Sequence, residues 1–231
     1  MTHEELLTSR LERMSRSEEA SSIPDVPYFS QWESADLVPA LLAGTISAAR
    51  DPLWRSSGAV SPEEYEFWSW RACGVACLRM VLSYWCVKPP PALVLIKECL
   101  AAGAYVQRDA QRVDGLLYEP FAHYVRRRWG LRVDVGAPLH LADLTGHVQD
   151  GSLVMASVHP SIRELAPDPP ARGGHLVLVV GVTTGGMVLH NPSGLPGRSQ
   201  RFAIVSTHDF GRFYADRGVI LSRPQPQPDQ R

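Results

Sequence analysis

Residues 71–85 read RACGVACLRMVLSYW, and both the fold and the chemistry of this chain can be inferred from this segment outward. Its apolar residues from Leu78 onward recur at helical spacing, which predicts a helix that begins at Cys73. Gly74 suits a tight turn into that helix and leaves the sulfur uncrowded. Unpaired N–H groups and the helix dipole lower a thiol pKa at such a position, so we expect a reactive thiolate. On its own, however, Cys-Gly-x-x-Cys is more often a buried helix with ordinary core cysteines.

The whole chain has the size and composition of one globular domain with short extensions. It has 231 residues, of which 45% are hydrophobic and 20% charged, and its formal net charge is −1; these are ordinary globular values. This charge gives no reason to expect nucleic acid as a partner, and the three arginines at 126–128 are better explained as the solvated end of a helix. No apolar run reaches membrane-spanning length, so we expect no membrane partner.

The first residues, MTHEELL, lack both a basic start and an apolar signal core. We therefore expect a cytoplasmic protein. The four cysteines (Cys73, Cys77, Cys86 and Cys99) should then be reduced thiols. Their spacing lacks the Cys-x-x-Cys pairs of common zinc sites, and we expect no metal or other cofactor.

Three parts are expected along the chain. Residues 1–22 alternate charged and small polar groups and predict a polar N-terminal extension. Residues 23–222 form the folded domain. Residues 223–231 are rich in proline and glutamine and predict a disordered tail.

Helix signals dominate the first half of the domain. Ser61 followed by Pro62 and two glutamates predicts a capped helix, and Gly130 predicts the end of a helix that starts at Glu119. Further helices are expected over residues 35–43, 73–85, 93–102 and 142–148, with loops over 51–60 and 103–115.

The second half is mostly β. Strands are expected over residues 131–135, 152–158, 175–182, 187–191, 202–205 and 218–221, with a helix over 207–215 before the last of them. Four prolines between residues 160 and 172 predict a surface loop. Helices followed by antiparallel strands in one domain make an α+β arrangement.

Two polar residues stand at the ends of predicted strands. His175 opens an apolar strand at the edge of the core, where it can reach a neighbouring element; a purely structural histidine is an equal alternative. A hairpin would bring Asn191, at the end of the next strand, close to His175. Its amide oxygen could accept from one imidazole nitrogen and fix the tautomer. His190 points to the opposite face, so Asn191 is the better candidate.

A third candidate, Gln31, lies in an ordered, aromatic-flanked segment upstream of the cysteine. Its carboxamide could donate to an oxyanion together with the backbone N–H of Cys73. A surface glutamine without such a role is the alternative.

The order of these residues is that of papain-like cysteine peptidases: Gln, Cys at a helix start, His at a strand start, then Asn after the next strand. More closely, the chain resembles family thirty-nine of the cysteine peptidases, the bacteriocin-processing or double-glycine leader peptidases and their stand-alone relatives. The resemblance covers residues 23–222. It is carried by residues 26–31, 72–82, 174–181 and 190–192.

The resemblance implies a papain-like α+β fold in which a helical half carries the nucleophile and packs on an antiparallel β-sheet half. Cys73 would be the nucleophile, His175 the general base, Asn191 the orienting third member and Gln31 the oxyanion donor. Cys77 would then be a packed helix residue. The chain differs from many members in having alanine before Cys73 in place of aspartate, and in an insertion over residues 32–72.

These residues predict a cysteine peptidase that acts on a peptide or protein substrate, with a small peptide precursor as one candidate. Two alternatives stay open. The same acyl-enzyme could pass its acyl group to an amine or thiol, as in an acyltransferase or amide-forming enzyme. A papain-like domain without turnover could also serve as a peptide-binding module. The sequence does not specify the oligomeric state.

Overall fold

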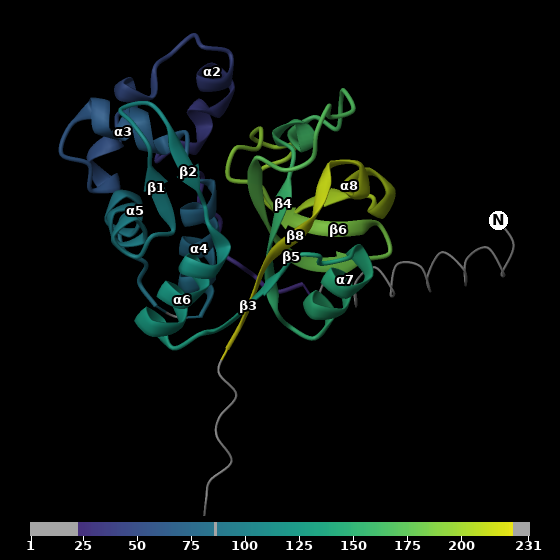
Figure 1. The fold of residues 1–231 in the computed structure, drawn as a ribbon. Coiled ribbons are helices and arrows are strands. Elements are labelled where there is room, and N and C mark those ends of the chain that lie inside the picture. Colours follow the sequence, from purple (N-terminus) through teal and green to yellow (C-terminus); the bar gives the residue numbers. More distant parts are fainter. Residues whose placement is uncertain (1–22, 86, 224–231) are drawn as a thin grey trace, which may run out of the picture.

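The computed structural model describes residues 23–85 and 87–223 (Figure 1). The expected N-terminal extension, Cys86 and residues 224–231 lie outside the described residues. The chain forms a helical half, on the left in Figure 1, and an antiparallel sheet beside it on the right. This is the α+β arrangement that the sequence predicts.

Helix α4 (Cys73–Tyr84) lies between the two halves. Most of its residues from Gly74 to Leu82 are buried, and it packs against strands β4 (Leu153–Val158) and β5 (His175–Thr183). The other main helices of this half are α3 (Pro62–Ser69), α5 (Ala92–Ala101) and α6 (Tyr118–Trp129). The predicted helix ends are confirmed: Ser61 Oγ accepts the Glu64 N–H at 3.2 Å, and Gly130 ends α6 with a φ of 66°.

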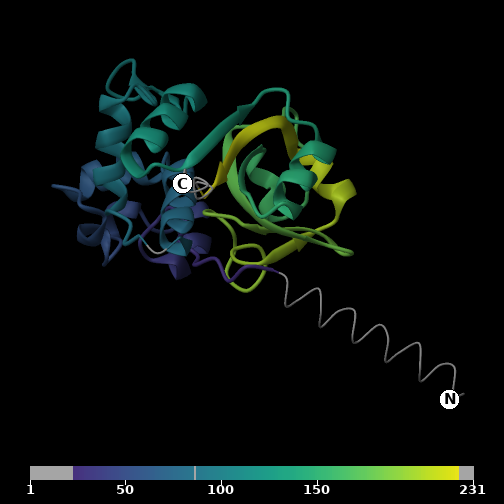
Figure 2. The ribbon, with the colours of Figure 1, turned by 90° about the horizontal axis from the view of Figure 1, so that it is seen from below.

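The sheet of the other half has six strands in the order β3-β8-β4-β5-β6-β7, and every neighbouring pair is antiparallel. Its remaining strands are β3 (Arg132–Gly136), β6 (Gly186–His190), β7 (Ala203–Val205) and β8 (Tyr214–Ser222). Seen from below, the sheet curls round helix α7 (Leu141–Gln149) (Figure 2).

Strand β5 is buried on both faces, and its alternating residues belong to two cores. Leu176, Leu178 and Val180 join the core shared with the helical half. Val177 and Val179 join a second core, covered by α7 and α8 (Thr207–Phe213). Each fully buried aliphatic side chain contributes about 1.5–3 kcal/mol, so both cores hold β5, and with it His175, in place.

Two predictions of local structure are wrong. Residues 103–115, expected as a loop, contain the hairpin of β1 (Tyr105–Gln107) and β2 (Val113–Gly115). These strands are too short for a clear alternation, but the Tyr105 hydroxyl donates to the Arg71 carbonyl at 3.0 Å and fastens the hairpin beside Cys73. The helix expected to continue to residue 215 ends at Phe213, because Tyr214 is buried at the start of β8 and donates to Leu139 O.

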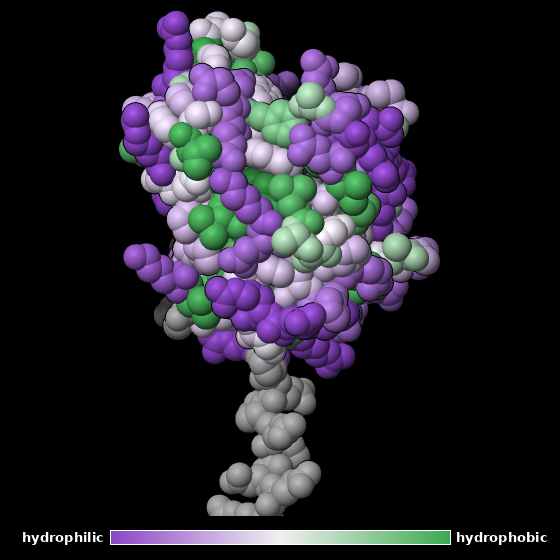
Figure 3. All heavy atoms as spheres, turned by 60° about the vertical axis from the view of Figure 1, so that its left-hand side comes forward, coloured by the Kyte–Doolittle hydropathy of each residue, from purple (hydrophilic) through white to green (hydrophobic). Residues whose placement is uncertain are grey.

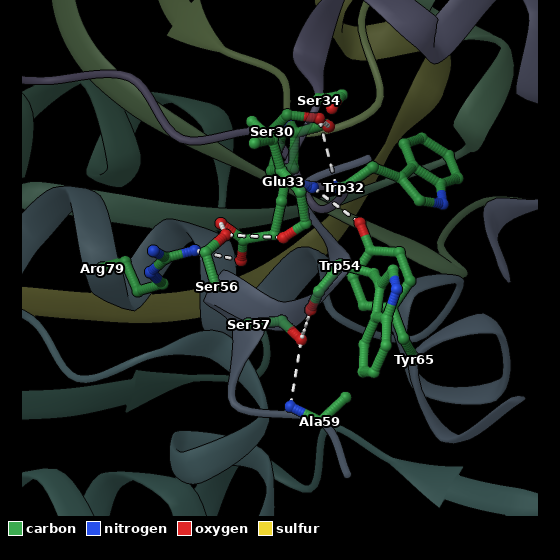
Figure 4. A network of polar contacts seen from close by, with 12 residues as sticks. Ser30, Trp32, Glu33, Ser34, Trp54, Ser56, Ser57, Ala59, Tyr65 and Arg79 are labelled. Carbon is green, nitrogen blue, oxygen red and sulfur yellow. Dashed lines mark hydrogen bonds and ion pairs between the residues drawn. The ribbon is translucent and has the colours of Figure 1, made fainter. Parts of the chain in front are cut away.

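The insertion over residues 32–72 is compact. It contains α2 (Val38–Leu42), α3 and three short 3₁₀ turns (Ala35–Leu37, Ala48–Arg50 and Trp54–Ser57), the last of them inside the expected 51–60 loop. Buried Asp51 accepts from Ser34 and from the Tyr65 hydroxyl, at 2.6 Å. That hydroxyl accepts the Glu33 N–H, and the Glu33 carboxylate pairs with Arg79 of α4 at 3.0 Å (Figure 4). The insertion is therefore fixed to the helix that carries Cys73.

The surface drawn in Figure 3 carries apolar side chains in small groups with hydrophilic ones around them. Within the described part of the chain, none of the helices is both long and apolar enough to cross a membrane.

Candidate active site

Cys73 is the first residue of α4, as predicted, and it lines a cleft between the two halves. The cleft has a volume of about 710 Å³, and His175 lines it together with residues 115–120. Gly74 permits the close packing of this region, since a Cβ there would come within 2.9 Å of Leu116 and 3.1 Å of Leu176.

His175 is hydrogen bonded to Asn191, the partner that the hairpin argument predicts. Its Nε2–H donates to Asn191 Oδ1 at 2.8 Å, and both side chains are buried. Among the described residues, Nδ1 has no hydrogen-bond partner. The backbone N–H of Leu176, the next residue along, is close enough to the Cys73 sulfur to lower the thiol pKa. The sequence-predicted cysteine, histidine and asparagine are therefore brought together.

The resting protonation of this pair differs from the expected thiolate. Burial raises the pKa of the Cys73 thiol, and the nearby N–H groups offset this only in part. Burial also lowers the pKa of His175 to about 4, with the Asn191 hydrogen bond opposing it and the charge of Arg163 adding to it. A low-dielectric site disfavours either charge, so the pair rests as a thiol and a neutral imidazole at neutral pH.

Gln31 lies between the two segments that carry the other candidates. Its backbone N–H donates to Pro192 O at 3.0 Å, next to Asn191. Its side-chain Nε2 donates to Ser69 O at 3.1 Å, four residues before Cys73. The amide has a second N–H, for which the described residues offer no partner. The insertion begins directly after Gln31, and the bond from Gln31 to Ser69 holds the end of the insertion beside its start.

The two residues that the sequence analysis set aside are structural. His190 Nε2–H donates to Val26 O at 2.8 Å, and its Nδ1 accepts the Phe202 N–H at 3.0 Å. Both of its ring nitrogens are therefore occupied by backbone groups. Cys77 is fully buried one turn into α4, with its sulfur 3.8 Å from Leu176 O.

Comparison with known proteins agrees with this geometry. The model of the Peptidase_C39 like family matches residues 23–215. The chain belongs to this family of cysteine peptidases. No curated protein matches the chain. The division into residues 1–22, 23–222 and 223–231 stays a prediction.

Two polar residues of this cysteine peptidase-like site escaped the sequence analysis. Ser193 Oγ lies 3.1 Å from His175 Nε2. The backbone N–H of Ser193 donates to Asn191 Oδ1 at 3.1 Å. Arg163 donates to Ser193 Oγ at 2.9 Å. Arg163 belongs to the proline-rich segment that was expected to be a surface loop, yet its Nε is buried and unpartnered. The only sequence signal was a serine two residues after Asn191.

Trp32 and Trp68 are buried and Trp70 is partly exposed, but none of them lines the cleft. No group of three or more His, Cys, Asp or Glu side chains in residues 23–85 and 87–223 is arranged to hold a metal ion.

Acid should destabilise the fold through two buried histidines. His175 and His190 both have a pKa of about 4 because burial disfavours the imidazolium, whereas the unfolded chain binds these protons near pH 6.5. The contribution of each is therefore complete above pH 6.5 and is lost as the pH falls to about 4, by roughly 3 kcal/mol per histidine.

This prediction can be checked by urea unfolding between pH 7 and pH 4. His190→Gln should reduce the fall in unfolding free energy over that range, and His123→Gln, at an exposed position, should not. An unfolding free energy that does not change between pH 7 and pH 4 would contradict the prediction.

Proposed function

We propose that the chain is a cysteine peptidase that hydrolyses a peptide bond through an acyl-enzyme on Cys73, with His175 as general base and Asn191 as its orienting partner. The observation that carries the proposal is the 2.8 Å bond from His175 Nε2 to Asn191 Oδ1 beside the cleft that Cys73 lines. This hydrogen bond occupies His175 Nε2 and leaves Nδ1 available to the thiol of Cys73.

The first half of the reaction forms a thioester. As the sulfur attacks the peptide carbonyl carbon, the thiol proton moves to His175 Nδ1, and Asn191 Oδ1 stabilises the imidazolium. The backbone N–H of Cys73 and the amide of Gln31 donate to the oxyanion. The C–N bond then breaks, and Nδ1–H gives its proton to the leaving amine.

The second half releases the acyl group. Nδ1 takes a proton from a water molecule that attacks the thioester carbonyl, and the same donors hold the second oxyanion. Collapse of this intermediate breaks the C–S bond, and the proton returns to the sulfur. The products are a carboxylic acid and the free thiol of Cys73.

The substrate in this proposal is a peptide or protein segment that lies extended in the cleft, such as a small peptide precursor. We place the reaction in the cytoplasm, since Cys73, Cys77 and Cys99 are free thiols, which fits a reducing compartment.

Substitutions should separate the three roles. Cys73→Ala and His175→Ala should each lower peptide hydrolysis by at least about 10³-fold. Asn191→Ala should lower it by roughly 10- to 100-fold, because orientation is weakened while the chemical groups remain. The measurement is mass spectrometry of a random decapeptide library after incubation with each variant.

Cys77→Ala is the matched control, since it removes a neighbouring buried thiol and should keep activity. Circular dichroism checks that every variant is folded. Cleavage that persists in folded Cys73→Ala would refute the proposal. Acyl groups recovered on added amines in place of water would identify an acyltransferase.

The role of Gln31 predicts a split between two reactions of the same thiol. Gln31→Ala should lower kcat for peptide hydrolysis by about 10²–10³-fold, as for the loss of one oxyanion donor. Alkylation of Cys73 by iodoacetamide develops no oxyanion, so its rate should change by less than about twofold. Equal losses in both reactions would show that Gln31 only supports the local structure.

A further inference from the structure

Two charged side chains line the cleft, one on each wall. Arg217 comes from β8 on the sheet side, and Glu119 comes from the first turn of α6 on the helical side. Arg217 is exposed and has no ion pair or hydrogen bond with any described residue. Its neighbour Asp216 is paired with Arg172, at 3.5 Å. The Arg217 guanidinium is therefore a free cation on the wall that also carries His175.

The guanidinium lies on the backbone that leads to His175. A Cβ on Gly173 would come within 2.7 Å of Arg217 Nη2 and 3.3 Å of Ser157 Oγ. Gly173, with a φ of 96°, therefore lets both the guanidinium and the hydroxyl come close to this part of the backbone. Ser157 Oγ, from β4, also lines the cleft and has no hydrogen-bond partner among the described residues. A cation and a hydroxyl donor thus lie beside the same glycine, and neither has a hydrogen-bond partner among the described residues.

The position of this pair fits a side chain two residues from the scissile bond. Gly173 precedes His175 by two residues, which span at most about 7 Å, and the chain turns here, since Gly173 and Gly174 have φ values of 96° and 91°. Alternate side chains of an extended peptide are separated by a similar distance and point the same way. The acyl half of a substrate stays bonded to Cys73, which lines the same cleft, so this half occupies it.

We propose that Arg217 and Ser157 form a subsite for a carboxylate side chain, and that the enzyme prefers aspartate or glutamate as the second residue on the acyl side of the bond it cleaves. This inference rests on the proposed function. A guanidinium presents a planar fork of N–H donors that matches a carboxylate, and the Ser157 hydroxyl can donate to it as well. Glu119 comes from α6, on the other wall of the cleft.

The test uses two probes that need no known substrate, acetyl-Glu-Ala-chloromethyl ketone and its Gln counterpart. Cys73 sulfur displaces chloride from either probe, and His175 takes the thiol proton. Intact-mass spectrometry gives both labelling rates. We expect the Glu probe to react about fivefold faster than the Gln probe at low salt, with a smaller ratio at 1 M salt because exposed charges are screened.

Arg217→Gln should reduce the Glu/Gln rate ratio to about one, and Arg217→Glu should reverse it. Arg127→Gln removes an exposed arginine of α6 that does not line the cleft, and it should keep the wild-type ratio. Glu119→Gln should not lower the ratio. A ratio near one in the wild type, or one unchanged in Arg217→Gln, would overturn the inference.

Failure of the subsite and failure of the proposed function give different results. A Glu preference that depends on Arg217, in a protein that hydrolyses no peptide, would leave the subsite standing and refute the peptidase. Peptide hydrolysis without a preference for the Glu probe would support the peptidase and refute the subsite. A Cys73 that iodoacetamide labels but neither probe alkylates would refute the subsite, because a peptide-shaped ligand would then not enter the cleft.

Discussion

The packing of helix α4 on strand β5 is the contact on which the rest of the structure depends. The apolar face of α4 meets Leu176, Leu178 and Val180 in one shared core, and this core joins the helical half to the sheet. Each element begins with a candidate catalytic residue, since Cys73 is the first residue of α4 and His175 is the first residue of β5. The non-directional burial of apolar surface therefore determines where two reactive groups meet.

The same burial sets the electrostatics of the site. It raises the pKa of Cys73 and lowers that of His175, so neither charge is stable before a substrate arrives. In the mechanism we propose, charge separation occurs during attack, when Asn191 and the oxyanion donors are in place to stabilise it. Arg163, which donates to Ser193, opposes protonation of His175 and so keeps its imidazole neutral before attack.

Helical and strand periodicity were enough to predict α4, β5 and the hairpin that brings Asn191 to His175, because these segments are long and apolar. The β1–β2 hairpin was missed because its strands are too short to alternate clearly. The thiolate was expected from the helix terminus alone, and the opposing burial could not be inferred without the walls of the cleft. The contacts of Ser193 and Arg163 depend on tertiary structure, as does the position of Arg217 in the cleft.

The most direct test of the account is the rate at which each cysteine of the native protein reacts with iodoacetamide at pH 7.5, measured by peptide mass spectrometry. If Cys73 is accessible from the cleft and His175 removes its proton, Cys73 should react faster than Cys77 and Cys99, which are buried. His175→Ala should then slow Cys73 by at least about tenfold. A Cys73 that reacts no faster than Cys99, or at the same rate without His175, would contradict the account.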